Sequence, residues 1–72
     1  MEIDEIIKFM RKELGLSQEI LARELNVSFA TLNRWEKRHT TPSRLAMSKI
    51  KEYAMNNTES DEVKNALSRY RT

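Results

Sequence analysis

The chain has 72 residues, no cysteine, one histidine and a net charge of +2 at pH 7. A chain of this length folds around one small core, so we predict a single domain without disulfides, and one histidine cannot form a zinc cluster. Because no apolar run reaches the roughly 20 residues of a membrane span and the first residues are acidic, we expect a soluble, cytoplasmic protein with no membrane partner.

The basic residues are concentrated in the middle of the chain. Segments 1–26 and 52–72 each carry a small excess of acidic side chains. A localised basic patch favours a polyanionic partner, and a solvated basic face is the alternative with the same composition. Residues 27–51 contain one acidic side chain, Glu36, and six basic ones: Arg34, Lys37, Arg38, Arg44, Lys49 and Lys51.

Apolar residues at three- and four-residue spacing predict a first helix over residues 3–14. Gly15 suits the left-handed residue that ends a helix, and Leu16 can then fold back on the helix end. Phe9 lies off the apolar stripe, so it is either partly exposed or covered by another segment. The stripe consists of Ile3, Ile6, Ile7, Met10 and Leu14.

Two serines predict the starts of the next two helices. Ser17 can cap a second helix, because its hydroxyl can accept a hydrogen bond from the free amides of the first turn. Asn26 suits the left-handed position that ends this helix, and Ser28 can cap a third helix over residues 29–37. The residues predicted to face inward are Ile20, Leu21, Leu25, Thr31, Leu32 and Trp35.

Thr41-Pro42 predicts the start of a fourth helix, with the threonine as cap and the proline at the first helical position. Asn56-Asn57 closes that helix, and Thr58 or Ser60 can cap a fifth. No useful length alternates with period two, so we predict no strands. The apolar stripes are Leu45, Ala46, Ile50, Tyr53 and Ala54 with Met47 beside them in the fourth helix, and Val63, Ala66, Leu67 and Tyr70 in the fifth.

The second and third helices are short and closely joined, which predicts a helix-turn-helix whose first helix braces the second in a groove of DNA. Further motifs accompany this pair at fixed spacing: Met10-Arg11, Leu14-Gly15-Leu16-Ser17-Gln18, Leu21-Ala22, Leu25-Asn26-Val27-Ser28, Leu32-Asn33-Arg34-Trp35-Glu36 and Thr41-Pro42-Ser43. Together they make residues 3–54 resemble the Cro and phage-repressor type of helix-turn-helix, also called the xenobiotic-response-element family.

The resemblance implies a compact all-α bundle of the lambda-repressor type, here with five short helices. It implies sequence-specific binding to double-stranded DNA by a prokaryotic or phage transcriptional regulator such as a repressor, with helix 29–37 in the major groove. Residues 1–57 then form the DNA-binding core. Residues 58–72 form a C-terminal helix that either completes this domain or makes a dimer contact, because the family's paired half-sites imply a homodimer on DNA.

The resemblance also assigns DNA contacts residue by residue. Base edges are assigned to Ser28, Phe29, Ala30, Asn33 and Arg34, and phosphates to Gln18, Lys37, Arg38, His39, Thr40 and Ser43. Side-chain chemistry supports the same division. Arg34 can donate two hydrogen bonds to guanine, Asn33 can pair with adenine, and Phe29 can contact a thymine methyl group.

The resemblance bears on three further positions. The family pairs an arginine of the first helix with the glutamate that ends the recognition helix, and Arg11 and Glu36 stand at those positions. We predict a partly buried structural ion pair; the alternative is two surface charges worth under about 1 kcal/mol. At Arg38 the family commonly has glycine. A left-handed arginine costs about 1 kcal/mol, so we expect the following loop to run differently.

Other functions have weaker support. No serine is accompanied by a histidine and carboxylate, and no glycine-rich phosphate loop is present, so we expect neither an enzyme nor a cofactor, metal or small-molecule ligand. Trp35 is at helical spacing from Leu32, which favours the core over stacking on a base. The alternative function is a protein-interaction module, antitoxin-like or adaptor-like, that uses the fifth helix and Phe9. A DNA-binding part of a longer protein is a third reading.

Overall fold

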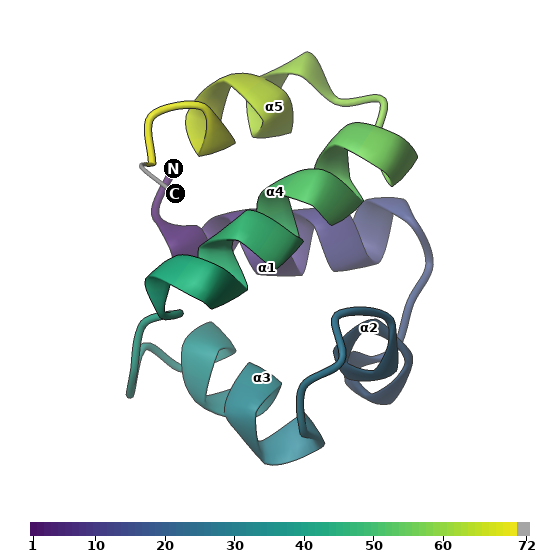
Figure 1. Cartoon of the computed structure of the whole chain (residues 1–72). Helices are drawn as coiled ribbons and strands as arrows, with labels where there is room; N and C mark the ends of the chain where they lie inside the picture. Colours follow the sequence, from purple (N-terminus) through teal and green to yellow (C-terminus); the bar gives the residue numbers. More distant parts are fainter. Residues whose placement is uncertain (71–72) are drawn as a thin grey trace.

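The computed structural model describes residues 1–70, in which all the regular secondary structure is helical (Figure 1). Within that range no residue lies in a strand, so the predicted all-α bundle is confirmed. The second and third helices form the predicted helix-turn-helix. The helices are α1 (Ile3–Glu13), α2 (Gln18–Glu24), α3 (Phe29–Glu36), α4 (Arg44–Asn57) and α5 (Asp61–Leu67).

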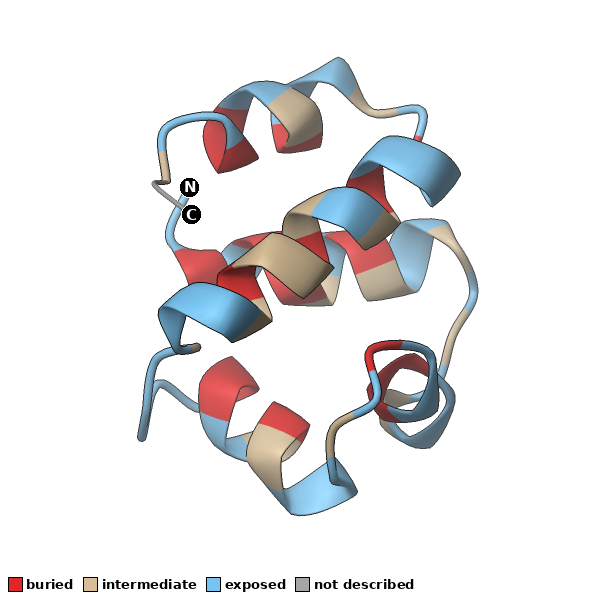
Figure 2. Cartoon of the chain, viewed as in Figure 1, coloured by how far each residue is buried: buried red, intermediate tan, exposed pale blue. Residues whose placement is uncertain are grey.

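The helices surround one core. Helices α1 and α4 lie in the middle of the molecule, between α5 at one end and the α2–α3 pair at the other (Figure 1). Figure 2 shows that the buried residues of each helix lie on its inward side. In this arrangement one side of α3 packs against the core, and its other side faces solvent. The core residues are Ile3, Ile6, Ile7, Met10, Leu21, Ala22, Leu25, Leu32, Trp35, Met47, Ile50, Ala54, Val63, Ala66 and Leu67.

Serine hydroxyls cap four of the helices. Each accepts a hydrogen bond from the backbone N–H three residues later, at 3.1–3.3 Å: Ser17 in α2, Ser28 in α3, Ser43 in α4 and Ser60 in α5. The prediction that Thr41 caps the fourth helix with Pro42 in its first turn is wrong, because α4 begins after Ser43. Thr41 and Ser43 carry equivalent hydroxyls, so local sequence does not decide between them.

Three helices end on left-handed residues: Gly15 at φ 68°, Asn26 at φ 58° and Arg38 at φ 64°. After α3, the His39 N–H donates to the Arg34 carbonyl at 2.9 Å and the Arg38 N–H donates to the Trp35 carbonyl at 3.2 Å. These bonds match those at the other two helix ends. The expectation that this loop runs differently is therefore wrong, since these hydrogen bonds hold Arg38 in the glycine-like conformation despite its cost.

Arg38→Gly is expected to raise the free energy of unfolding by up to about 1 kcal/mol, because glycine adopts positive φ without a steric penalty. Lys37→Gly is the matched control. Lys37 has φ −94°, so glycine gains nothing there and adds chain entropy to the unfolded state. Urea denaturation of both variants measures the difference. Destabilisation of the same size in both would contradict the assignment of strain to Arg38.

Two apolar residues predicted to face inward are exposed instead. Ile20 in α2 is 43% exposed and Leu45 in α4 is 70% exposed. The buried residues of α4 are Met47, Ile50 and Ala54, so Met47 lies in the core and Leu45 falls outside it. A stripe that includes either residue satisfies helical periodicity, and packing against the other helices decides between them.

Helix α5 is part of the same core. Val63 and Leu67 are fully buried, and Tyr70 packs partly against the core. The Thr58 hydroxyl before α5 donates to the Glu13 carboxylate, and the Lys51 ammonium donates to the Tyr70 carbonyl at 2.7 Å. The apolar side of α5 is therefore covered within the chain. Phe9, on α1, remains 40% exposed.

Candidate nucleic-acid interface

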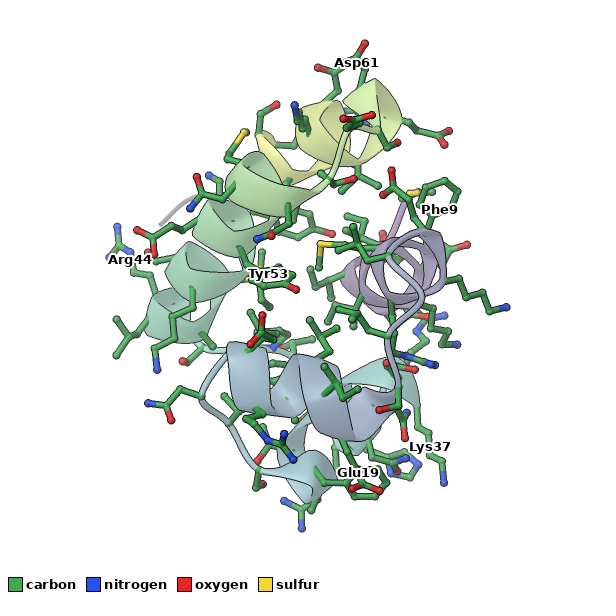
Figure 3. The ribbon with its side chains drawn as sticks, turned by 90° about the vertical axis from the view of Figure 1, so that its right-hand side faces the viewer. Phe9, Glu19, Lys37, Arg44, Tyr53 and Asp61 are labelled. Atoms are coloured by element: carbon green, nitrogen blue, oxygen red, sulfur yellow. The ribbon has the colours of Figure 1, made fainter. Side chains whose placement is uncertain are left out.

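Helix α3 has one buried side and one outward side. Leu32 is fully buried and Trp35 is 5% exposed, so these two side chains hold α3 against the core. Phe29 and Arg34 are exposed on the other side of the helix. Figure 3 shows Lys37, which follows α3, at the end of the molecule opposite Asp61 of α5. The outward side of α3 is therefore free to contact another molecule.

The residues assigned to base edges come together on this side, but they differ in exposure and in their hydrogen bonds. Phe29 is 49% exposed, and Ala30 and Arg34 are also exposed. The Ser28 hydroxyl accepts from the Thr31 N–H and donates to the Thr31 hydroxyl at 2.9 Å, so it is engaged in capping. Asn33 is half-buried and contacts α2. Arg34 thus carries the only cationic group on the outward side of α3 itself within the described structure.

The residues assigned to phosphates lie in the segment between α3 and α4 and at the start of α2. Lys37, Arg38, His39, Thr40 and Ser43 are all exposed. Arg38 has a charged neighbour, because its Nε lies 3.8 Å from Oδ1 of the buried Asp4 carboxylate. At 69% exposure, the Arg38 side chain keeps most of its surface toward solvent. This segment therefore adds positive charge beside α3.

Arg11 and Glu36 form a two-pronged ion pair that joins α1 to the end of α3. Nε of Arg11 donates to Oε2 of Glu36 at 2.9 Å, and a terminal nitrogen donates to Oε1 at 3.0 Å. The remaining guanidinium nitrogen of Arg11 donates to the Leu16 carbonyl at 3.3 Å. The Glu36 side chain is 4% exposed and that of Arg11 is 21% exposed. The one acidic side chain of the basic segment is thus buried and neutralised, so it does not oppose the charges around it.

Gln18 connects this ion pair to Asn33. The Gln18 amide nitrogen donates to Oε1 of Glu36 at 3.1 Å, and the Gln18 carbonyl oxygen accepts from the Asn33 amide nitrogen at 3.2 Å. The sequence assigned Gln18 to a phosphate and Asn33 to a base separately, and missed this connection. No spacing rule could have found it, since the two residues are fifteen positions apart on different helices.

A family model described as helix-turn-helix matches residues 7–53, which run from α1 into α4. The chain belongs to the helix-turn-helix family. It is a DNA-binding domain by family, and that family is not typically enzymatic. The comparison with curated proteins found no significant match, and neither did the comparison with solved structures.

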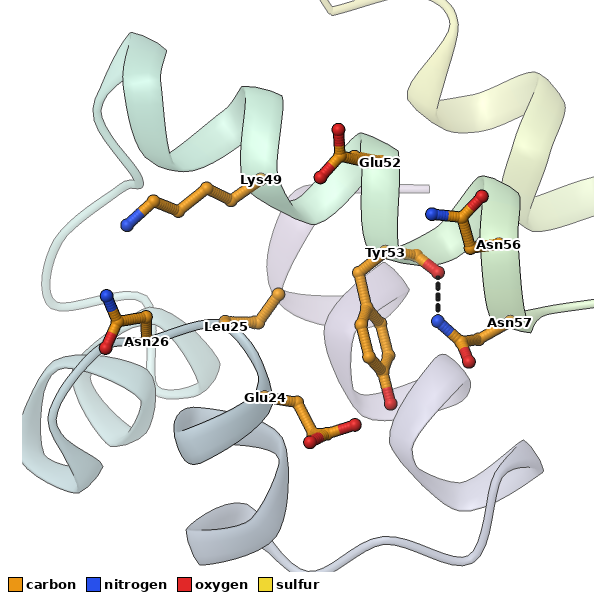
Figure 4. A pocket seen from close by; sticks show the side chains of 8 residues that line it. All are labelled: Glu24, Leu25, Asn26, Lys49, Glu52, Tyr53, Asn56 and Asn57. Carbon is orange, nitrogen blue, oxygen red and sulfur yellow. Dashed lines mark hydrogen bonds between the residues drawn. The ribbon is translucent and has the colours of Figure 1, made fainter.

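The helix-turn-helix domain also has an open pocket between α2 and α4 (Figure 4). Partial burial raises the pKa of Tyr53, and the nearby negative charge of Glu24 raises it further. None of the lining residues belongs to α3, so the pocket is separate from the outward side of that helix. It is lined by Glu24, Leu25, Asn26, Lys49, Glu52, Tyr53, Asn56 and Asn57.

Within residues 1–70, two features of other kinds of site are absent. No helix in that range is long and apolar enough to cross a membrane. In the same range, no three histidine, cysteine, aspartate or glutamate side chains are grouped so that they could hold a metal ion.

Proposed function

We propose that this helix-turn-helix domain is a transcriptional regulator that reads the base sequence of double-stranded DNA with α3 in the major groove. The observation that carries the proposal is the division of α3 into two sides. Its inward side is held by Leu32, Trp35 and the Arg11–Glu36 pair, whereas its outward side presents polar and apolar groups suited to base edges. A rigid, outward recognition helix is what this docking geometry requires.

Three kinds of base contact are proposed. The exposed Arg34 guanidinium can donate in parallel to O6 and N7 of guanine. The exposed Phe29 ring and the Ala30 methyl group can contact a thymine methyl group. Asn33 can pair with adenine, and Ser28 lies at the start of α3 where it can approach the DNA. Few hydrogen-bonding readers are present, so we expect Arg34 and Asn33 to determine most of the sequence preference.

The segment after α3 is proposed to contact the phosphate backbone. Lys37 and Arg38 supply its positive charges, and His39, Thr40 and Ser43 can donate hydrogen bonds to phosphate oxygens. Gln18 retains one amide hydrogen beyond the one given to Glu36, so it can also donate to a phosphate. Such contacts position the protein without reading sequence.

The likeness to phage repressors also supports a homodimer on paired half-sites, acting in the cytoplasm. A symmetric binding site would report that arrangement. The alternative of a protein-interaction module has less support, because the apolar side of α5 that it would use is buried within the chain. The four exposed basic side chains Arg34, Lys37, Arg38 and Arg44 favour a polyanion instead.

Arg34→Ala and Lys37→Ala should weaken DNA binding in different ways. Arg34→Ala is expected to cost about 1–3 kcal/mol on the preferred duplex and to abolish discrimination at one base pair. Lys37→Ala should weaken binding to every duplex alike and lower the salt dependence by about one unit of slope. Dissociation constants on the preferred duplex and its single base-pair variants, at several salt concentrations, measure both. Equal losses on all duplexes for Arg34→Ala would reject base reading by α3.

A further inference from the structure

A chain of hydrogen bonds runs from α1 through α2 to the outward side of α3. It begins at Arg11, passes through the Glu36 carboxylate and the Gln18 amide, and ends at the Asn33 amide. All three side chains of Arg11, Gln18 and Asn33 are half-buried, and Glu36 is buried. Each hydrogen bond in this chain has a donor and an acceptor, so the way in which each side-chain amide is turned affects its neighbours.

The Glu36 charge fixes the direction of every later link. An ionised carboxylate only accepts hydrogen bonds, so Gln18 must turn its NH₂ group toward Glu36. The carbonyl oxygen of Gln18 must then face Asn33. A carbonyl oxygen also only accepts, so Asn33 must turn its own NH₂ group toward Gln18. Reversing either amide would place two acceptors against each other.

This direction determines what Asn33 has left for DNA. One of its two N–H groups is given to Gln18, which leaves one N–H donor and the carbonyl acceptor. Adenine presents one acceptor and one donor in the major groove, whereas guanine presents two acceptors. The remaining groups of Asn33 therefore match adenine. A reversed Asn33 would turn both N–H groups outward, and those would match guanine.

We infer that Glu36 and Gln18 are positioning residues that set the base preference of Asn33, by fixing the direction of its amide so that it selects adenine over guanine. This inference rests on the proposed reading of DNA by α3. It assigns to Gln18 a role in specificity that a phosphate contact alone does not have, since a phosphate contact affects all sequences alike.

Two substitutions at Gln18 test the inference in opposite ways. Gln18→Met removes both polar ends, so Asn33 is free to turn and its preference for adenine, expected to be roughly 5- to 150-fold in wild type, should fall to a few-fold at most. Gln18→Lys supplies donors only. Lysine can donate to both Glu36 and the Asn33 carbonyl, so this variant should reverse Asn33 and select guanine at the same base pair.

The measurement is selection from a pool of random duplexes, with wild type, Gln18→Met, Gln18→Lys and Asn33→Ala in parallel. Asn33→Ala identifies the base pair that Asn33 reads. A role for Gln18 in stability alone would change the affinity of its variants without exchanging adenine for guanine at that pair. The expected result is loss of preference in Gln18→Met and a change to guanine in Gln18→Lys.

Failure of the inference and failure of the proposed function give different results. If wild type enriches a motif that depends on Asn33, but both folded Gln18 variants keep the adenine preference, the inference is overturned and the proposed function stands. If Asn33→Ala keeps every preference of wild type, Asn33 is no reader and the inference is again overturned. If wild type enriches no motif, both fail.

Discussion

Arg11→Ala is expected to lower the free energy of unfolding by about 3 kcal/mol. Its removal leaves the Glu36 carboxylate, 4% exposed, with one hydrogen bond from Gln18 and no opposite charge. Breaking a buried ion pair from one side typically costs about 3–5 kcal/mol, and the 21% exposure of Arg11 places this pair at the lower end. A domain of this size has a total stability of only about 4–11 kcal/mol. The loss is measured by urea denaturation followed by circular dichroism.

Arg23→Ala is the matched control for this prediction. Arg23 lies near the end of α2 and its side chain is exposed, so its removal should change stability by less than about 0.5 kcal/mol. A second comparison replaces both charged side chains of the ion pair. The double variant Arg11→Met with Glu36→Leu should recover much of the loss, because no unpaired charge is left in the core. Equal stabilities of Arg11→Ala and Arg23→Ala would mean that the pair contributes nothing.

Trp35→Ala is expected to destabilise the domain by about 3–5 kcal/mol, which is a large part of the total stability of a domain of this size. Trp35 is 5% exposed and belongs to the core, so alanine would leave a large cavity under α3. Trp35→Phe keeps an aromatic ring in that space and should cost considerably less. Thermal denaturation of the two variants measures the difference.

Trp35 fluorescence distinguishes a structural role of this residue from a role in stacking on a base. A core tryptophan is expected to show little change in fluorescence when a DNA duplex is added, because its ring does not reach the DNA. The contrary result would be a Trp35→Ala variant that is as stable as wild type but no longer binds DNA. That outcome would place Trp35 at the interface and not in the core.

Local signals in the sequence predicted most of the fold. Serine caps and the residues suited to left-handed helix ends located the helices within one or two positions, because capping depends on neighbouring residues only. The exposed Leu45 and the choice of Ser43 over Thr41 could not be predicted. Both depend on how α4 rests on the other helices, which periodicity and capping chemistry leave open.

The candidate site was predictable in part. The spacing of Arg11 and Glu36 matched a known family, and the structure brings them together with two hydrogen bonds. The hydrogen bonds of Gln18 with Glu36 and Asn33 were not predictable, since they join side chains whose proximity arises only when α2 and α3 pack. The conformation of Arg38 was not predictable from its residue type, because backbone hydrogen bonds hold it at a positive φ that arginine disfavours.

DNA reading by α3 is tested most directly by selection from a pool of random-sequence duplexes at two salt concentrations, with wild type and Arg34→Ala in parallel. We predict that wild type enriches one motif at both concentrations and that Arg34→Ala loses discrimination at one base pair of it. If wild type retains no duplex at moderate salt, or if both proteins enrich the same motif, α3 does not read DNA through Arg34.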